Sequence, residues 1–373
     1  MWIDANFDCG NIDVVSGEDP SNIRLKIKPD AGSEHAQWFY FRVLEAAGKT
    51  CFFNIINAGD ASYPEAWPNG SIVFSQDRKF WQRQVTSFDG ETLSFEIKCE
   101  AETLYVALCP PYADDQHQTL IGRALSSEFC HLIAVIPTVQ RRPIELLQIG
   151  NVSPQSRRVW IIARQHPGEP MAEWYVEGLL DRLLDRDDDV AKRLRQMCCF
   201  FVVPNMNPDG SAAGHLRTNA AGVDLNRAWA SANVETSPEV HGVLAAMEQS
   251  GVDLFLDIHG DEELAFVFAA GCEGNPGYTK DLANADQRFR ALYQKANPDF
   301  STENGYTPDA PGAADLSIAC NQVAERFGCL SLTIEMPFKD TAKRPDPVEG
   351  WSASRSKALG ASALTALADY FDV

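Results

Sequence analysis

The stretch Arg158-Val-Trp-Ile-Ile-Ala163, followed by Gln165-His166-Pro-Gly-Glu169 and Pro170, decides the fold predicted for this chain. Its apolar run is typical of a strand that is buried on both faces of a parallel sheet. Pro170 begins a stretch with apolar residues at helical spacing, and proline is well tolerated at the first position of a helix. The stretch therefore predicts a buried strand, a short loop and a helix, as in an α/β fold.

Three further apolar runs predict more strands of the same sheet. They are Phe200–Val203, Leu254–Ile258 and Leu330–Ile334. His166 and Glu169 follow one predicted strand, and His259 is the residue on which another ends. Because ligands bind beyond the carboxyl ends of strands in open α/β sheets, we expect these three side chains to converge at one edge.

These three residues form a candidate metal site. Two imidazoles and one carboxylate leave a fourth position for water, which is what a hydrolytic zinc site requires. A histidine and a glutamate at the spacing of His166 and Glu169 are common by chance, and each histidine could instead be a loop residue with its hydrogen bonds satisfied. The complete set of three predicts one Zn²⁺ per chain.

The segments around these residues carry a family resemblance. They are Pro204-Asn-Met-Asn-Pro-Asp-Gly210, His215-Leu-Arg217, Gly222-Val-Asp-Leu-Asn-Arg227 and Thr333-Ile-Glu335. In this order, together with the three candidate ligands, they resemble the zinc carboxypeptidase family over residues 120–373. The resemblance implies a mixed sheet of the eight-stranded type flanked by helices, and hydrolysis of the C-terminal peptide bond.

The resemblance also implies catalytic roles. His166, Glu169 and His259 would hold the zinc ion. Glu335 would be the general base that takes a proton from the attacking water, and Arg217 would stabilise the oxyanion. Asp224 would orient a histidine ligand and fix its tautomer. Asp257 lies on the same strand face as His259, and could be a second such partner or a structural carboxylate.

Substrate binding is implied for three further residues. Asn226 and Arg227 would bind the terminal carboxylate, because the planar guanidinium offers two parallel hydrogen bonds. Tyr306 would correspond to the mobile tyrosine that closes over the last residue of the substrate in digestive members. Those members also have an arginine inside the H-x-x-E motif, where this chain has Pro167 and Gly168.

The first 118 residues have a different pattern. Apolar and polar residues alternate in Ile23–Lys28, as in a half-buried strand, and no apolar periodicity of helix length appears. Similar runs follow between turn-forming residues: Trp38–Val43, Thr50–Ile56, Ser71–Phe74, Phe80–Val85, Thr92–Ile97 and Leu104–Leu108. We expect an antiparallel β-sandwich of seven or eight strands over 1–118, followed by the catalytic domain over 119–373.

Two segments of this region, Gln37–Val43 and Cys109–Tyr112, resemble signature segments of the cytosolic carboxypeptidase subfamily, which trims glutamates from protein tails. The resemblance implies peptide or protein C-terminal tails as substrates. A glutamate preference would require a cation in the pocket, for which Arg326 and Lys339 are candidates unless they are solvated surface charges. The sequence leaves the released residue and the oligomeric state open.

Composition favours a cytoplasmic enzyme. The ten cysteines show no C-x-x-C spacing, which indicates free thiols, and the N-terminus lacks the basic and apolar regions of a secretory signal. No window approaches the roughly 20 apolar residues that span a membrane. The net charge of −20 argues against nucleic acid as a partner, because phosphate binding requires a basic surface.

Two alternatives remain open. Zinc-dependent N-acyl-amino-acid hydrolases of the aspartoacylase and succinylglutamate desuccinylase type share the H-x-x-E and D-x-N-R elements. Their accessory β-domain follows the catalytic domain, however, whereas here the residues after Glu335 predict a single closing helix from Trp351 to Phe371. A pseudoenzyme used as a binding module would lack a ligand or the catalytic glutamate, and neither is missing.

Overall fold

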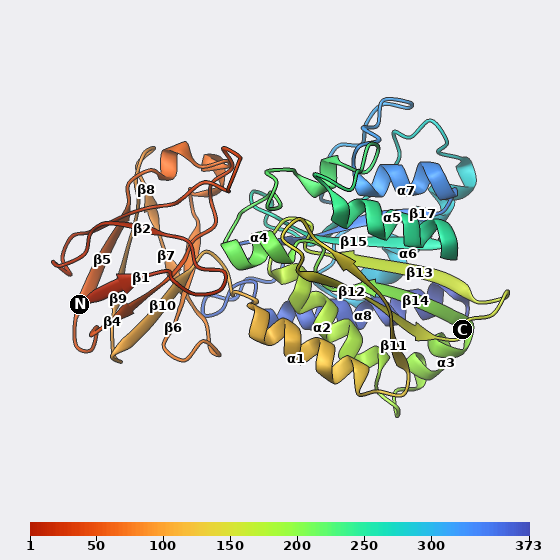
Figure 1. Cartoon of the computed structure of the whole chain (residues 1–373), viewed down its shortest axis with the longest axis horizontal. Coiled ribbons are helices and arrows are strands. Elements are labelled where there is room, and N and C mark those ends of the chain that lie inside the picture. Colours follow the sequence, from red (N-terminus) through yellow and green to blue (C-terminus); the bar gives the residue numbers. More distant parts are fainter.

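The computed structural model describes the whole chain, residues 1–373, and Figure 1 shows two parts of different architecture side by side. The N-terminal part contains two five-stranded sheets. One has the order β1 (Trp2–Asp4), β4 (Tyr40–Leu44), β10 (Thr103–Ala107), β6 (Ser71–Ser75) and β7 (Gln82–Val85). The other has the order β2 (Asp13–Ser16), β3 (Ile23–Lys26), β5 (Thr50–Ile55), β9 (Leu93–Lys98) and β8 (Ser87–Phe88).

The apolar residues that alternate with polar ones in the sequence form the core of this part. In β3, Ile23 and Leu25 are buried whereas Arg24 and Lys26 are exposed, because successive strand residues face opposite sides. Pairing is antiparallel except between β3 and β5, since the intervening β4 belongs to the other sheet. The ten strands exceed the seven or eight expected, because β1, β2 and β8 are short edge strands without apolar alternation.

The C-terminal part is built on a mixed seven-stranded sheet, which confirms the predicted α/β class. Its order is β11 (Cys130–Pro137), β12 (Pro143–Gly150), β14 (Cys198–Val203), β13 (Arg157–Ala163), β15 (Leu254–Asp261), β17 (Leu330–Pro337) and β16 (Phe268–Ala270). The four central strands from β14 to β17 are parallel, and the strands at both edges are antiparallel. The sheet has seven strands, and the segment at Phe300 adds only one isolated bridge, to Val267 next to β16, instead of an eighth strand.

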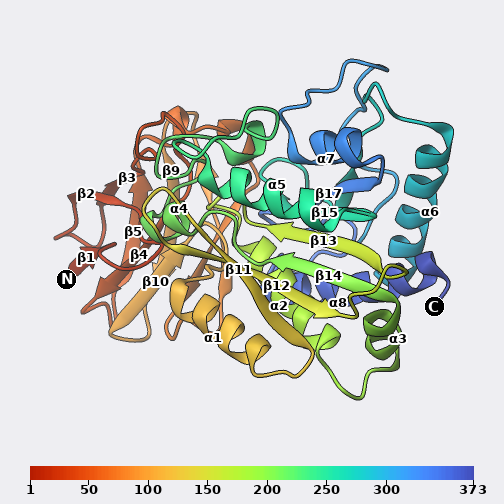
Figure 2. The same cartoon turned by 45° about the vertical axis from the view of Figure 1, so that its right-hand side comes forward.

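Helices cover both faces of this sheet, on opposite sides in Figure 2. Val159 and Ile161 of β13 belong to one apolar core, and Trp160 and Ile162 belong to a second core on the other face. The first core is covered by α2 (Met171–Leu183), α3 (Asp189–Met197), α6 (Lys280–Ala296) and α8 (Ala353–Phe371). The second is covered by α5 (Pro238–Ser250) and α7 (Ala319–Phe327). Buried strands thus carry apolar residues in continuous runs.

Two glycines bring α2 and α8 into direct backbone contact. A Cβ atom at Gly178 would lie 2.1 Å from the carbonyl oxygen of Lys357, and one at Gly360 would lie 2.0 Å from that of Tyr175. Any larger residue would push the two helices apart. Because α2 begins directly after the His166–Glu169 loop, this contact anchors the scaffold of the candidate site.

The two parts are joined by helix α1 (Asp114–Leu125), which contains the predicted boundary between residues 118 and 119. Hydrogen bonds also connect the parts near α4 (Pro208–Ala213), from the Cys9 amide to the Ala212 carbonyl at 3.1 Å and from the Asn11 side chain to the Gly214 carbonyl at 2.7 Å. The division into 1–118 and 119–373 therefore remains a prediction.

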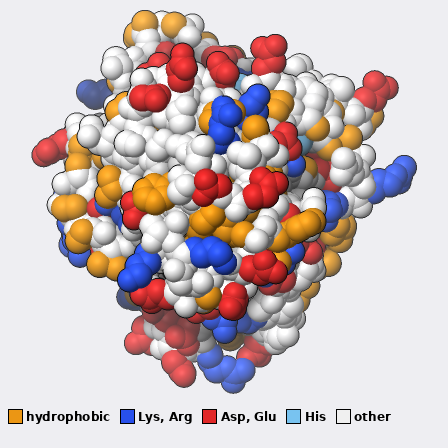
Figure 3. Space-filling model, turned by 90° about the vertical axis from the view of Figure 1, so that its left-hand side faces the viewer, with side chains coloured by type: hydrophobic (Ala, Val, Ile, Leu, Met, Phe, Trp, Pro, Cys, Tyr) orange, Lys and Arg blue, Asp and Glu red, His pale blue; other side chains and the backbone are white.

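The surface of the N-terminal part carries charges of both signs. Figure 3 shows acidic side chains spread over this face, with lysine, arginine and apolar side chains between them. All ten cysteines are buried and free. None of the helices combines the length and apolar character that a membrane-spanning helix needs.

The central strands bring the predicted site residues to one edge. His166 follows β13, and His259 lies in β15 directly opposite Glu335 of the neighbouring β17. In parallel strands such opposed residues lie on the same face of the sheet, since side-chain direction alternates along each strand. The expected convergence at one sheet edge is therefore confirmed at the level of the fold.

Candidate active site

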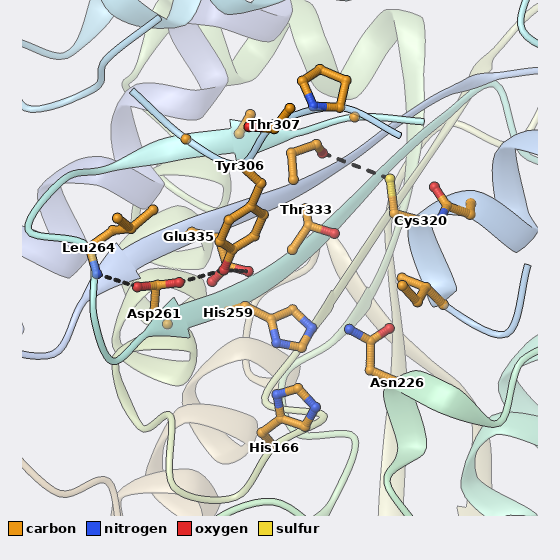
Figure 4. A pocket seen from close by; sticks show the side chains of 18 of the residues that line it. His166, Asn226, His259, Asp261, Leu264, Tyr306, Thr307, Cys320, Thr333 and Glu335 are labelled. Carbon is orange, nitrogen blue, oxygen red and sulfur yellow. Dashed lines mark hydrogen bonds between the residues drawn. The ribbon is translucent and has the colours of Figure 1, made fainter. Parts of the chain in front are cut away.

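The three candidate metal ligands meet at a single point. Their ligand atoms lie within 4.8 Å of one another, and all three residues are buried. His166 Nδ1 is 2.6 Å from Glu169 Oε1, and His259 Nδ1 is 2.8 Å from Glu169 Oε2. Figure 4 shows the two imidazole rings one above the other at the floor of the cavity. The same ring nitrogen of each histidine therefore faces the shared carboxylate.

A second carboxylate lies behind each histidine. His166 Nε2 is 3.0 Å from Asp224 Oδ1, and His259 Nε2 is 3.0 Å from Asp257 Oδ2. The carboxylate accepts a hydrogen bond from the Nε2–H group, so each imidazole keeps a lone pair on Nδ1, the nitrogen that faces the centre. This donor set, two imidazole nitrogens and one carboxylate with carboxylates behind them, fits Zn²⁺.

Two residues that the sequence did not single out extend this arrangement. The Gln165 side chain donates to Asp257 at 2.7 Å, and the Trp229 indole donates to Gln165 at 2.8 Å. Gln165 is fully buried, so its amide has no water to bond with and its orientation is fixed by these partners. The pair thus holds Asp257 against His259.

Neighbouring charged groups determine the pKa shifts of Glu169 and of Asp224. Burial alone would raise the pKa of Glu169, but the His166 and His259 imidazoles outweigh burial and hold that pKa well below its usual range. For Asp224, burial is likewise outweighed by His166 and Arg217, and its pKa is depressed. Of the two, Glu169 belongs to the ligand set, and a carboxylate must be ionised to bind a metal.

The loop that carries His166 and Glu169 is anchored by hydrogen bonds of Arg164. This residue has a left-handed backbone conformation, with φ of 57°, which is unfavourable for a residue other than glycine. Its buried guanidinium donates to the Pro167 carbonyl at 3.0 Å, to the Tyr112 carbonyl at 2.7 Å and to the Glu173 carboxylate. These bonds compensate for the backbone strain and fix the loop.

Glu173 is the centre of this buried network. It is fully buried in α2 and also accepts hydrogen bonds from Asn205 at 3.0 Å and from His117 at 2.7 Å. The other ring nitrogen of His117 is 3.1 Å from Glu145. Burial lowers the pKa of His117, but the two glutamates outweigh burial and raise it to about 10. The network joins α1, β12 and α2 beneath the candidate site.

Glu335 and Tyr306 lie together on one wall of the cavity (Figure 4). The Tyr306 hydroxyl donates to Asp261 at 2.5 Å and is 3.4 Å from Glu335 Oε1. Glu335 Oε2 is buried without a hydrogen-bond partner within the protein. Burial, aided by Glu169 and opposed by His259, raises the pKa of Glu335 to about 8. A carboxylate with an unused oxygen at this position can accept a proton.

The remaining predicted residues line the same cavity. Arg217 donates through Nε to Asp224 at 2.8 Å, and burial of its guanidinium is outweighed by Asp224, which raises its pKa. Asn226 is buried, and its side-chain oxygen accepts from the Ala319 amide at 2.9 Å. Arg227 is exposed, and its guanidinium donates to the Asn226 carbonyl at 2.9 Å. The structure thus brings all the predicted site residues together.

The cavity has a volume of about 660 Å³, and part of its lining carries acidic side chains. We define the acidic recess by five residues of the cavity lining: Gly271, Glu273, Gly274, Arg290 and Asp309. Arg290 is held by Glu273 at 3.2 Å and by Asp286, so its charge is balanced inside the protein.

The two cations considered as pocket residues lie elsewhere. Arg326 pairs with Glu248 at 3.3 Å on the surface, and Lys339 donates to the Ala66 carbonyl at 3.1 Å. Neither lines the cavity. Arg326 belongs to the last turn of α7, whose buried face is turned toward the sheet.

Tyr63 is a lining residue that no pattern in the sequence could reveal. It comes from the N-terminal part, 154 residues before Arg217, and its hydroxyl accepts a hydrogen bond from Arg217 at 2.7 Å. The segment around Tyr63 has no periodicity or motif, so the role of Tyr63 in the cavity lining is visible only in the packing of the two parts.

Comparison with known proteins agrees with this geometry. Residues 3–108 match the cytosolic carboxypeptidase N-terminal domain, and residues 122–347 match the zinc carboxypeptidase family. A metallo-carboxypeptidase from Pseudomonas aeruginosa is 47% identical, with a TM-score of 0.97 over 100% of this chain and 99% of that one. A metallo-carboxypeptidase from Burkholderia cenocepacia is 44% identical, with a TM-score of 0.97 over 100% of this chain and 99% of that one.

A mammalian relative matches over part of its length. Cytosolic carboxypeptidase 3 of Bos taurus is 29% identical over 336 residues, which make up 80% of this chain and 33% of that protein. This chain thus spans about a third of the mammalian relative. Both domain matches and the solved structures lead to one conclusion: the chain belongs to the zinc carboxypeptidase family and is a metallocarboxypeptidase, a hydrolase of peptides.

Proposed function

We propose that this protein removes the C-terminal residue of peptides in a zinc-dependent reaction at the His166–Glu169–His259 centre. The convergence of these three buried ligands beside Glu335 and Arg217 in one cavity carries the proposal. When bound, zinc supplies a Lewis acid that polarises the scissile carbonyl and lowers the pKa of a water. One Zn²⁺ per chain is expected, and the names of the relatives support a cytoplasmic location.

The chain's own residues would perform the proton and charge transfers. The unpartnered Oε2 of Glu335 accepts a proton from the attacking water, and the protonated carboxyl then gives it to the leaving amine. Arg217 donates hydrogen bonds to the oxyanion as charge develops there, which lowers the energy of the transition state. Asp224 holds both Arg217 and His166, so it keeps the two groups at a fixed distance from one another.

Asn226 and Arg227, on the part of the cavity lining away from Glu335, would recognise the substrate terminus. The exposed guanidinium of Arg227 and the adjacent Asn226 are available to bind the terminal carboxylate, the group that distinguishes an exopeptidase substrate. Tyr306, next to Glu335, would pack against the last residue and exclude water. The division into an accessory part, 1–118, and a catalytic part, 119–373, forms part of the same proposal.

The acidic recess favours a cationic side chain over the glutamate that the subfamily resemblance implied. Arg290 already shares its charge with Asp286 and Glu273, and Asp309 adds a further carboxylate nearby. A glutamate side chain would meet this net negative charge, whereas lysine or arginine would be attracted. The Pseudomonas aeruginosa structure contains (2-guanidinoethylmercapto)succinic acid, a compound with a guanidinium and two carboxyl groups, which supports the same preference here.

Parallel assays of blocked peptides with a free C-terminus and of N-acyl amino acids would test this function. The proposal predicts release of the last residue from peptides, loss of activity on chelation and recovery on addition of zinc. Faster hydrolysis of simple N-acyl amino acids would instead favour the acylase alternative. Activity in a preparation shown to be free of metal would refute the zinc-dependent mechanism.

A further inference from the structure

The N-terminal part contacts the segment around Arg217 at two places. Asp30, which is 2% exposed, accepts hydrogen bonds from the backbone amides of Leu216 at 2.6 Å and of Arg217 and Thr218 at 2.8 Å each. The Thr218 hydroxyl adds a fourth bond at 3.0 Å. One buried carboxylate from the other half of the chain thus fixes the backbone at Arg217.

The second place is the side chain of the same arginine. The Tyr63 hydroxyl accepts from Arg217 Nη1 at 2.7 Å, while Asp224 accepts from Nε at 2.8 Å. Tyr63 is itself held, because its amide donates to the buried Gln37 side chain at 2.8 Å. Nη2 of Arg217 is left without a hydrogen bond inside the protein, so it is free to meet a ligand in the cavity.

We propose that the N-terminal part is a component of the active site, in which Asp30 and Tyr63 are positioning residues that align Arg217 for the oxyanion. A free arginine side chain has many rotamers, and fixing it before the reaction removes the need to reorganise it in the transition state. Held at Nε and at Nη1, the planar guanidinium has one orientation. This inference rests on the role proposed above for Arg217.

The Tyr63→Phe variant of the full chain tests the inference. It removes one oxygen atom and keeps the ring, so zinc content and the thermal unfolding midpoint should stay as in the parent protein. We expect kcat to fall about 10-fold, the low end for a hydrogen bond to a charged group, with KM changed less than about 2-fold. Tyr105→Phe is the matched control, because that hydroxyl belongs to the same sandwich and does not line the cavity.

A double-mutant cycle separates positioning from an independent effect. If Tyr63 acts through Arg217, the Tyr63→Phe change should cost less than about 2-fold in kcat in the Arg217→Ala background. An equal loss in both backgrounds would overturn the inference, and so would an unchanged kcat in Tyr63→Phe alone. If Arg217→Ala itself keeps full kcat, the role of Arg217 in the proposed mechanism fails as well.

The Asp30→Asn variant extends the test to the backbone anchor. Its amide nitrogen cannot accept from the amides at 217 and 218, so kcat should fall again with zinc retained. Because the loss of a buried carboxylate can also unfold the chain, Tyr63→Phe is the variant that decides between positioning and a structural role. A Tyr63→Phe protein with the kcat of the parent overturns the inference whatever Asp30→Asn does.

Discussion

Replacing Glu173 by glutamine removes one negative charge from the network beneath the metal ligands. Glu173 is fully buried and is the counter-ion of Arg164, whose side chain is 2% exposed. The glutamine keeps the shape of the side chain, but it leaves the Arg164 guanidinium buried without a full countercharge. Because Arg164 also holds the Pro167 carbonyl, the change should loosen the loop that carries His166 and Glu169.

The expected loss of stability follows from the burial of the Glu173–Arg164 ion pair. Removing one partner of a buried ion pair costs about 3–5 kcal/mol, because the other charge remains desolvated. For a chain of 373 residues each kcal/mol shifts the unfolding midpoint by roughly 1–2 °C, so the midpoint should fall by about 3–10 °C. Glu177→Gln, one turn further along α2, is the control. Its partners Arg123 and Lys357 are 49% and 35% exposed, so the expected cost is only about 0–1 kcal/mol.

Thermal unfolding followed by both fluorescence and circular dichroism would measure the two variants beside the parent protein. Zinc content after dialysis provides the second readout, and Glu173→Gln should lose zinc more readily than Glu177→Gln. Equal unfolding midpoints for the two variants would refute the reasoning, since the cation paired with Glu173 is buried whereas the cations paired with Glu177 are partly exposed.

Three further outcomes are expected. Glu335→Gln should lower kcat by about 10²–10⁴-fold while zinc and substrate still bind, as measured by steady-state kinetics and metal analysis. The pKa of His117 is raised from 6.5 to about 10, so its stabilising contribution is complete below pH 6.5 and is lost as the pH rises through 10. Urea unfolding from pH 7 to 10 should therefore show a steeper loss of stability for the parent protein than for His117→Gln. Glu273→Gln should reduce kcat/KM for peptides ending in lysine several-fold relative to those ending in alanine, whereas Glu303→Gln, outside the recess, should not.

The fold and the ligand set could be predicted because both depend on local patterns. The apolar run before His166 and the one that ends at His259 define buried strands, and the ends of parallel strands meet at one edge. The alternation in Ile23–Lys28 likewise predicts a half-buried strand, and β3 occupies that place. Neither prediction requires knowledge of contacts between distant segments.

The parts of the site that could not be predicted depend on long-range packing. Tyr63 and Asp30 act on the Arg217 loop from another part of the chain, and no motif marks them. The acidic recess combines residues from separate loops with Arg290 of α6, so its charge balance appears only after folding. The parallel pairing of β3 with β5 follows from the crossing of β4 to the other sheet, which alternation alone does not encode.

Removal of a C-terminal residue is most directly tested by mass spectrometry of a matched pair of peptides, one with a free C-terminus and one amidated. We expect the parent protein to shorten the free acid by one residue and to leave the amide intact, because we propose that Arg227 and Asn226 bind the terminal carboxylate. Arg227→Ala should cut the free acid poorly and discriminate little between the two peptides. Equal cleavage of both peptides by the parent protein, or cleavage within the peptide, would contradict the proposed exopeptidase function.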